Sequence, residues 1–116
     1  MRNKWAYSQR LTKIIALKVR GVPAGGRVDV RCKGGKKKRC SFKRKVVAKP
    51  DGGSVNVRKL FKRKALEPGA KIEIRVTAAG AIGRYVAYRI RAGKIPKLTT
   101  RCLAPGSSKP VRCSAL

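Results

Sequence analysis

The sequence predicts an all-β protein: a small antiparallel β-sandwich of the immunoglobulin-like type, with about six or seven strands. Two observations predict this fold. Apolar and charged residues alternate along several short stretches, as in strands with one buried and one exposed face. Glycine- and proline-containing turns separate these stretches at short, fairly regular intervals. The 116 residues fit one domain, and their 42% apolar content suffices for a modest core.

The pattern divides the chain into three parts. Residues 1–11 show no clear alternation, so we expect an N-terminal arm. Residues 12–95 contain the alternating stretches and form the predicted sandwich. Residues 96–116 hold three prolines and two cysteines, which predict an irregular tail, closed by a disulfide and packed on the domain.

The first two predicted strands are KIIALKVRG at 13–21 and RVDVRCK at 27–33, separated by a turn with Pro23 and two glycines. Their period of two predicts which side chains are buried. In the first strand these are Ile15, Leu17 and Val19, and in the second they are Val28, Val30 and Cys32.

The middle of the chain is less regular. The stretch 41–49 is a weaker strand whose buried face the pattern does not decide, and 54–57 is a short strand. Residues 58–70 fit either a helical turn or a crossing loop, with Leu60, Phe61 and Leu66 as candidate core residues.

Two strong strands follow. KIEIRVT at 71–77 is the best in the chain, with Ile72, Ile74 and Val76 predicted inward. RYVAYRIRAG at 84–93 places Val86, Tyr88 and Ile90 inward and Tyr85, Arg89 and Arg91 outward. Because arginines and lysines occupy the outward positions, we expect at least one face of a sheet to be basic.

The net charge of +28, from 32 basic and four acidic residues, indicates a polyanionic partner. Three clusters of lysine and arginine are the predicted binding residues. They are Lys33, Lys36, Lys37, Lys38 and Arg39; Lys43, Arg44 and Lys45; and Arg58, Lys59, Lys62, Arg63 and Lys64. No base-reading motif accompanies them, so binding is expected to be sequence-independent and salt-dependent. Tyr85 and Trp5 are candidate stacking platforms.

Four cysteines allow three disulfide pairings. Each cysteine has a near neighbour, which favours Cys32–Cys40 and Cys102–Cys113. Zinc is disfavoured because the chain has no histidine and no Cys-x-x-Cys pair. Free buried thiols in a cytosolic protein are the other alternative.

Catalysis is not expected. Without histidine there is no Ser-His or Cys-His pair, and the four acidic residues are scattered singly. Asp29 and Glu73 lie at outward positions among arginines, where ion pairing is the expected role. The glycine-containing turns match no phosphate-cradling pattern, so we predict no cofactor, no metal and no catalytic residue.

Several motifs carry a family resemblance: LKVRGVPAGGRVDVRCKG, PGAKIEIRVTAAGAIG and the final RCL…PGS.KP.RC. Together they span about residues 11–113 and resemble a recurrent cationic β-domain of predicted secreted or surface proteins of high-GC bacteria. The resemblance implies an immunoglobulin-like or fibronectin-like sandwich, an extracellular location and paired cysteines at Cys32, Cys40, Cys102 and Cys113. It implies no catalytic residue.

The expected function is a non-catalytic, secreted or cell-surface module that binds anionic polymers such as extracellular DNA, wall phosphopolymers or acidic glycans. One alternative is an intracellular nucleic-acid-binding protein of ribosomal or nucleoid type. Another is a structural subunit of an extracellular fibre or assembly, and self-association through the N-terminal arm is also expected. No apolar run approaches the roughly 18 residues of a membrane span, and no signal peptide is visible.

Overall fold

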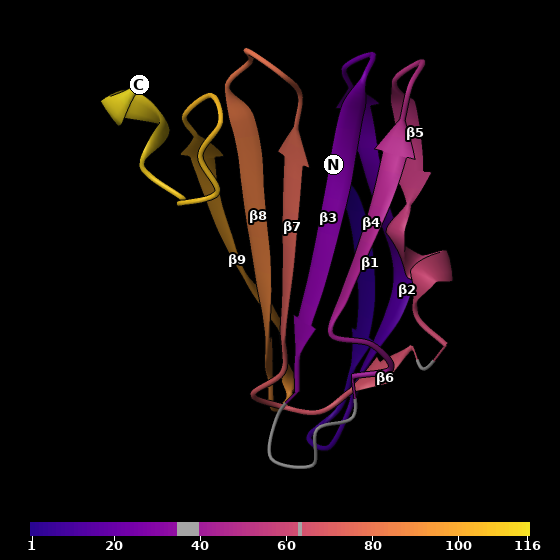
Figure 1. Ribbon diagram of the computed structural model, residues 1–116. Helices are drawn as coiled ribbons and strands as arrows, with labels where there is room; N and C mark the ends of the chain where they lie inside the picture. Colours follow the sequence, from indigo (N-terminus) through magenta and orange to yellow (C-terminus); the bar gives the residue numbers. More distant parts are fainter. Residues whose placement is uncertain (35–39, 63) are drawn as a thin grey trace.

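Two antiparallel β-sheets pack face to face in the computed structural model, which describes residues 1–34, 40–62 and 64–116 (Figure 1). The predicted sandwich is therefore confirmed. The smaller sheet consists of β1 (Arg2–Tyr7), β2 (Thr12–Val22), β5 (Gly53–Asn56) and β6 (Ala65–Leu66). The larger sheet, in spatial order, consists of β4 (Arg44–Lys49), β3 (Gly26–Lys33), β7 (Lys71–Thr77), β8 (Gly83–Arg91) and β9 (Lys94–Leu103).

The core between the sheets is built mainly from branched aliphatic side chains. Val28, Val30, Ile72 and Ile74 of the larger sheet are fully buried, and Val86, Tyr88 and Ile90 follow the predicted facing of β8. Burial of one such side chain stabilises the fold by about 1.5–3 kcal/mol. The alternation in 27–33, 71–77 and 84–93 thus predicted the inward positions correctly.

A 3₁₀ turn resolves the ambiguous segment after β5. The turn η1 spans Val57–Leu60, and the next residue, Phe61, is completely buried. Its ring lies 4.7 Å from the ring of Phe42, centroid to centroid, and the chain then pairs with β2 through β6. The segment is therefore a short helical turn followed by a crossing connection that fills one end of the core.

Both terminal segments are more regular than predicted. Residues 2–7 are not a free arm: they form the edge strand β1, paired with β2, and the Trp5 ring packs against Tyr88 at 5.2 Å. At the other end, β9 continues to Leu103, so the irregular tail begins at residue 104 and not at 96. Pro96 fits in β9 because β9 is an edge strand, where a missing N–H need not break the ladder.

The first predicted strand has the right location but the wrong buried residue. Ile14 is fully buried, whereas Ile15, predicted inward, is 39% exposed. The pairing of β1 with β2 slips here: Lys4 pairs with Ala16 and Trp5 with Ile14. Ile15 is the extra residue of this bulge, and a bulge reverses the facing of everything before it.

Both predicted disulfides are present. Cys32 is bonded to Cys40 and Cys102 to Cys113, and no described cysteine is free. The second bond holds the C-terminal tail against β9, where Val111 forms a bridge with Cys102. All four sulfurs are thereby used, which removes the zinc and free-thiol alternatives.

Candidate anion-binding face

The outer surface of the larger sheet gathers cationic side chains from all five strands. Register places Lys33, Lys71, Arg89 and Lys97 next to one another across β3, β7, β8 and β9, and we call these four the basic row. Neighbouring strands are only about 4.8 Å apart, so the four charges form a continuous line. Three further rows across the sheet hold the remaining cations: Arg31 with Arg44, Arg75 with Arg101, and Arg27. We define the outer cationic face by all nine cations: Arg27, Arg31, Lys33, Arg44, Lys71, Arg75, Arg89, Lys97 and Arg101.

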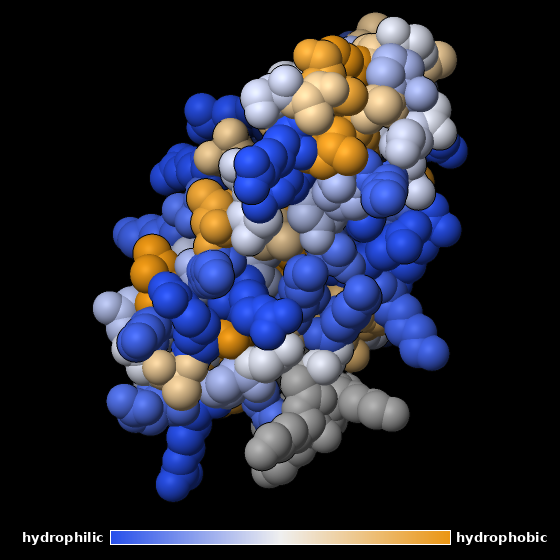
Figure 2. Space-filling model, turned by 90° about the vertical axis from the view of Figure 1, so that its left-hand side faces the viewer, coloured by the Kyte–Doolittle hydropathy of each residue, from blue (hydrophilic) through white to orange (hydrophobic). Residues whose placement is uncertain are grey.

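This face is strongly unbalanced in charge. Nine cations meet only two carboxylates, Asp29 and Glu73, which leaves seven net positive charges on one side of a single sheet. Figure 2 shows hydrophilic residues over most of the surface seen from the β9 side, with hydrophobic residues concentrated near one end. The basic sheet face expected from the alternation is therefore present.

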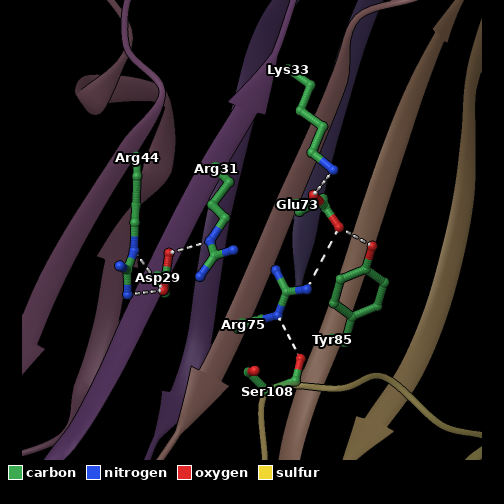
Figure 3. Close-up of polar contacts among 8 residues, drawn as sticks. All are labelled: Asp29, Arg31, Lys33, Arg44, Glu73, Arg75, Tyr85 and Ser108. Carbon is green, nitrogen blue, oxygen red and sulfur yellow. Dashed lines mark hydrogen bonds and ion pairs between the residues drawn. The ribbon is translucent and has the colours of Figure 1, made fainter.

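Asp29 organises the arginines at one end of the face. Arg44 donates to Asp29 Oδ2 from Nε at 3.0 Å and from Nη2 at 2.7 Å, and Arg31 Nε lies 3.5 Å from Oδ1 (Figure 3). The hydrogen bond and charge of Asp29 raise the pKa of Arg44 above its ordinary value. One carboxylate thus holds two guanidinium groups side by side.

Glu73 is the second organising acid, and it is nearly buried. Tyr85 donates its hydroxyl to Glu73, while Lys33 and Arg75 lie 3.4 and 3.7 Å from its oxygens (Figure 3). Lys71 Nζ lies 3.9 Å from Glu73 Oε2. Burial alone would raise the pKa of Glu73. The hydrogen bond from Tyr85 and the charge of Lys33 outweigh burial and hold the pKa below its ordinary value. Burial and the Glu73 carboxylate raise the pKa of Tyr85 to about 12.

The sequence-predicted clusters are only partly available for binding. Lys36, Lys37, Lys38, Arg39 and Arg63 lie outside the described residues. Lys33 and Arg44 belong to the outer cationic face. Three other cations bind backbone carbonyl oxygens with their charged ends: Lys45 binds Leu60, Arg58 binds Ile14 and Lys64 binds Phe61. Those three stabilise the turn around η1, whereas Lys43, Lys59 and Lys62 are exposed.

The two predicted stacking platforms differ in exposure. Tyr85 points to the outer side, as predicted, but it is only 5% exposed because it packs with Leu103 and Arg75, so its ring face is not open to a base. Trp5 is partly buried against Tyr88 and the core, and base stacking on its exposed part stays a prediction.

Seven cations of the face were not among the predicted binding residues. They are Arg27, Arg31, Lys71, Arg75, Arg89, Lys97 and Arg101. The available signal for five of them was their outward position in strands 27–33, 71–77 and 84–93. Lys97 and Arg101 lie on β9, most of which was predicted to be irregular tail. Lysine and arginine are most frequent along the sequence in the loops, which is why the loops were predicted to bind. How closely cations lie on the folded surface depends instead on which strands pair.

Comparisons with protein-family models, with curated protein sequences and with solved structures returned no match. Within residues 1–34, 40–62 and 64–116, no helix is long and apolar enough to cross a membrane. We therefore infer function from the residues of this chain alone.

Proposed function

We propose that this protein is a non-catalytic, secreted or cell-surface β-sandwich module that binds anionic polymers through its outer cationic face. The candidate polymers are extracellular DNA, wall phosphopolymers and acidic glycans. They share a repeating phosphate, sulfate or carboxylate group, and this shared feature is what the face recognises.

One observation supports the proposal above all: the seven net positive charges on one face of a five-stranded sheet. Opposed like charges destabilise neighbouring strands, and the basic row places four of them in line. A polyanion laid across the row relieves this repulsion and releases its own counterions. The gain from binding therefore grows with the number of cations that the polymer spans.

The shape of the face also favours polymers. It is a broad sheet surface, and its hollow beside the basic row is small, about 280 Å³, lined by Lys71, Ala87, Arg89, Lys97 and Thr99. Lysine acts as a mobile point charge, whereas arginine can hold an oxyanion with two parallel hydrogen bonds. The affinity of such a surface for a polymer depends on the charge density of the polymer and not on its base sequence.

The two disulfides support an extracellular location. Disulfides persist in oxidising compartments and are rare in the cytosol, where thiols are kept reduced. They argue against the intracellular ribosomal or nucleoid alternative. The fibre-subunit alternative requires self-association, which the net charge of +28 opposes.

The test is a salt titration of polymer binding. The affinity of the oxidised protein for a 30-base-pair DNA, for heparin and for polyphosphate is measured between roughly 0.05 and 0.3 M salt. We expect log affinity to fall linearly with log salt for all three polymers, because each neutralised phosphate contributes about 0.9 to the slope for DNA. A flat salt profile for every polymer would contradict the proposal.

Two variants of equal charge locate the binding surface. The row variant changes Lys33, Lys71, Arg89 and Lys97 to glutamine. The control variant changes three lysines and one arginine of the smaller sheet to glutamine: Lys4, Lys13, Lys18 and Arg20. We expect the DNA slope to fall by about 3 to 4 in the row variant and by much less in the control. Equal losses in both would show that net charge, and not this face, binds the polymer.

A further inference from the structure

A second and larger hollow lies at the end of the outer cationic face farthest from the basic row. Its volume is about 620 Å³, within the range of small-molecule sites. Asp29, Arg31 and Arg75 form its floor, and Arg44 and Val46 of β4 form one wall. The opposite wall is the tail at Gly106, Ser107 and Ser108, and the turn at 78–81 closes the end.

The lining of this hollow is cationic even after its internal ion pairs are counted. Four arginines, Arg27, Arg31, Arg44 and Arg75, face one carboxylate, Asp29, which leaves three net positive charges. Asp29 Oδ2 accepts hydrogen bonds from Arg44, and Oδ1 lies 3.5 Å from Arg31 Nε without a hydrogen bond, so this carboxylate lies between the two guanidinium groups. Arg27 is exposed and has no ion pair with a described residue. The hollow is therefore an arginine-lined site, partly organised by Asp29.

Arg75 carries an unused hydrogen-bond donor. Its Nε donates to the Ser108 carbonyl at 3.1 Å, its Nη2 lies 3.7 Å from Glu73, and its guanidinium stacks on the Tyr85 ring at 4.9 Å. The third nitrogen, Nη1, is buried and has no hydrogen-bond partner among the described residues, and Figure 3 draws no dashed line to it. Arg31 Nε also lacks a hydrogen-bond partner, but it faces the unpaired Oδ1 of Asp29 at 3.5 Å. Buried donors without partners are costly, so a ligand oxygen that reached Arg75 Nη1 would remove this cost.

The rest of the lining is small. Alanine and glycine fill the turn at 78–81, and Gly106 and two serines line the tail. These residues leave room for a body the size of one sugar, and their hydroxyl and backbone groups can bond to sugar hydroxyls. Tail and floor are joined by the Arg75–Ser108 hydrogen bond, and the Cys102–Cys113 disulfide anchors the tail to β9.

We propose that this hollow binds a phosphate monoester carried on a sugar-sized unit. A phosphate monoester carries about 1.5 to 2 negative charges at pH 7 and offers three acceptor oxygens, which matches three net positive charges and the arginine donors. This inference rests on the proposed function: the hollow takes a terminal or pendant phosphorylated sugar of the polymer whose chain lies across the basic row.

The test uses glucose 6-phosphate as the probe, with glucose and inorganic phosphate as comparisons, by calorimetry on the oxidised protein at 0.15 M salt. We expect saturable binding of glucose 6-phosphate, at least tenfold weaker binding of inorganic phosphate and no binding of glucose. Equal affinity for the two phosphates overturns the sugar-sized part of the inference. No saturable binding of glucose 6-phosphate overturns the inference as a whole.

Two changes test the hollow, and the second of them leaves the cations of the polymer surface unchanged. Changing Arg27 and Arg31 to glutamine should weaken glucose 6-phosphate at least tenfold, whereas the matched change of Arg10 and Arg20, both exposed outside the hollow, should have little effect. Ala79→Phe fills the hollow from the exposed turn without changing charge, and it should weaken the sugar phosphate while DNA affinity stays within about threefold. Equal weakening of glucose 6-phosphate by both arginine pairs would overturn the inference.

The two proposals fail in different ways. If DNA, heparin and polyphosphate bind with the expected salt slope but glucose 6-phosphate does not, the hollow is not a site and the proposed function stands. If glucose 6-phosphate binds but no polymer does, the proposed function falls, and with it the assignment of the hollow to a polymer end.

Discussion

The two ends of the outer cationic face use positive charge in different ways. At the basic row, Lys33 and Lys71 share Glu73, while Arg89 and Lys97 are exposed. At the arginine-lined end, Asp29 lies between Arg31 and Arg44, and the Ser108 carbonyl of the tail accepts a hydrogen bond from Arg75. A loose row suits any polyanion, whereas an ordered cluster lowers the ordering cost for one defined group. We propose that one sheet face thereby combines general attraction of polyanions with a more ordered arginine site.

The largest expected effect comes from removing the support of the arginine-lined end. Changing Cys102 and Cys113 to serine opens a loop closed by a disulfide across 11 residues. In the chain-entropy model this costs roughly 2.5–3 kcal/mol of unfolding free energy. Chemical denaturation should show this loss, and glucose 6-phosphate should weaken far more than DNA. Equal weakening of both ligands would contradict the division between the two ends.

The next largest effect comes from the hydrogen bond between Tyr85 and Glu73, which lies between the two ends of the face. Tyr85→Phe removes the buried hydroxyl that donates to Glu73. A hydrogen bond to a charged group contributes about 1.5–3 kcal/mol, so the variant should lose about that much unfolding free energy. Urea denaturation at pH 7 measures it. Tyr88→Phe is a matched control on the inner side of the same strand, since the Tyr88 hydroxyl bonds to the uncharged groups of Met1 and Asn3 and not to a carboxylate. Its loss should be smaller. A larger loss of unfolding free energy in Tyr88→Phe than in Tyr85→Phe would contradict the importance of the Tyr85–Glu73 hydrogen bond.

A smaller, pH-dependent effect comes from Glu73 itself. Its pKa is lowered in the folded protein, so its ionised form stabilises the fold above the unfolded pKa of about 4.3, and that stabilisation is lost as pH falls through the lowered folded value. Glu73→Gln should therefore be less stable than the native protein at pH 7, by about 1 kcal/mol, and the difference should shrink as the pH falls through the lowered folded pKa of Glu73. Unfolding free energies measured from pH 2 to pH 7 test this. A difference that grows on acidification would have the wrong sign.

The smallest expected effect is at the edge of the arginine-lined end. Arg44 pairs with Asp29 but its side chain is 56% exposed, and exposed ion pairs contribute little to stability. Arg44→Gln should leave the melting temperature nearly unchanged while weakening glucose 6-phosphate severalfold, because Arg44 forms one wall of the hollow. A clear fall in melting temperature would show that the pair supports the fold.

The sequence predicted the strands that have one buried face and one solvent-exposed face. Residues 27–33 and 71–77 alternate because each strand is central in its sheet and covered on one side. Strand β1 was not predicted because its sequence lacks the alternation of buried and exposed residues. It is an edge strand whose side chains are nearly all exposed, with Trp5 alone packed inward. Ile15 was misplaced because a bulge is set by the pairing with β1 and leaves no mark in the local pattern.

The candidate site was also only partly predictable, because strand pairing does not follow from the local sequence pattern. The alternation predicted a basic sheet face, but not that Lys33, Lys71, Arg89 and Lys97 would form one row, because register between distant strands is a property of pairing. The outward facing of Tyr85 was predicted correctly. Its burial was not, because it packs with Leu103 of the neighbouring strand β9, eighteen residues later in the chain.

Lysine footprinting tests the central claim most directly. The oxidised protein is labelled with an amine-reactive acylating reagent, with and without a saturating heparin oligosaccharide, and each modified lysine is identified by mass spectrometry. We predict that the oligosaccharide protects Lys71 and Lys97 on the outer cationic face and leaves Lys4 and Lys13 on the smaller sheet reactive. Protection of Lys4 and Lys13 with continued labelling of Lys71 and Lys97 would contradict the assignment of this face as the binding surface.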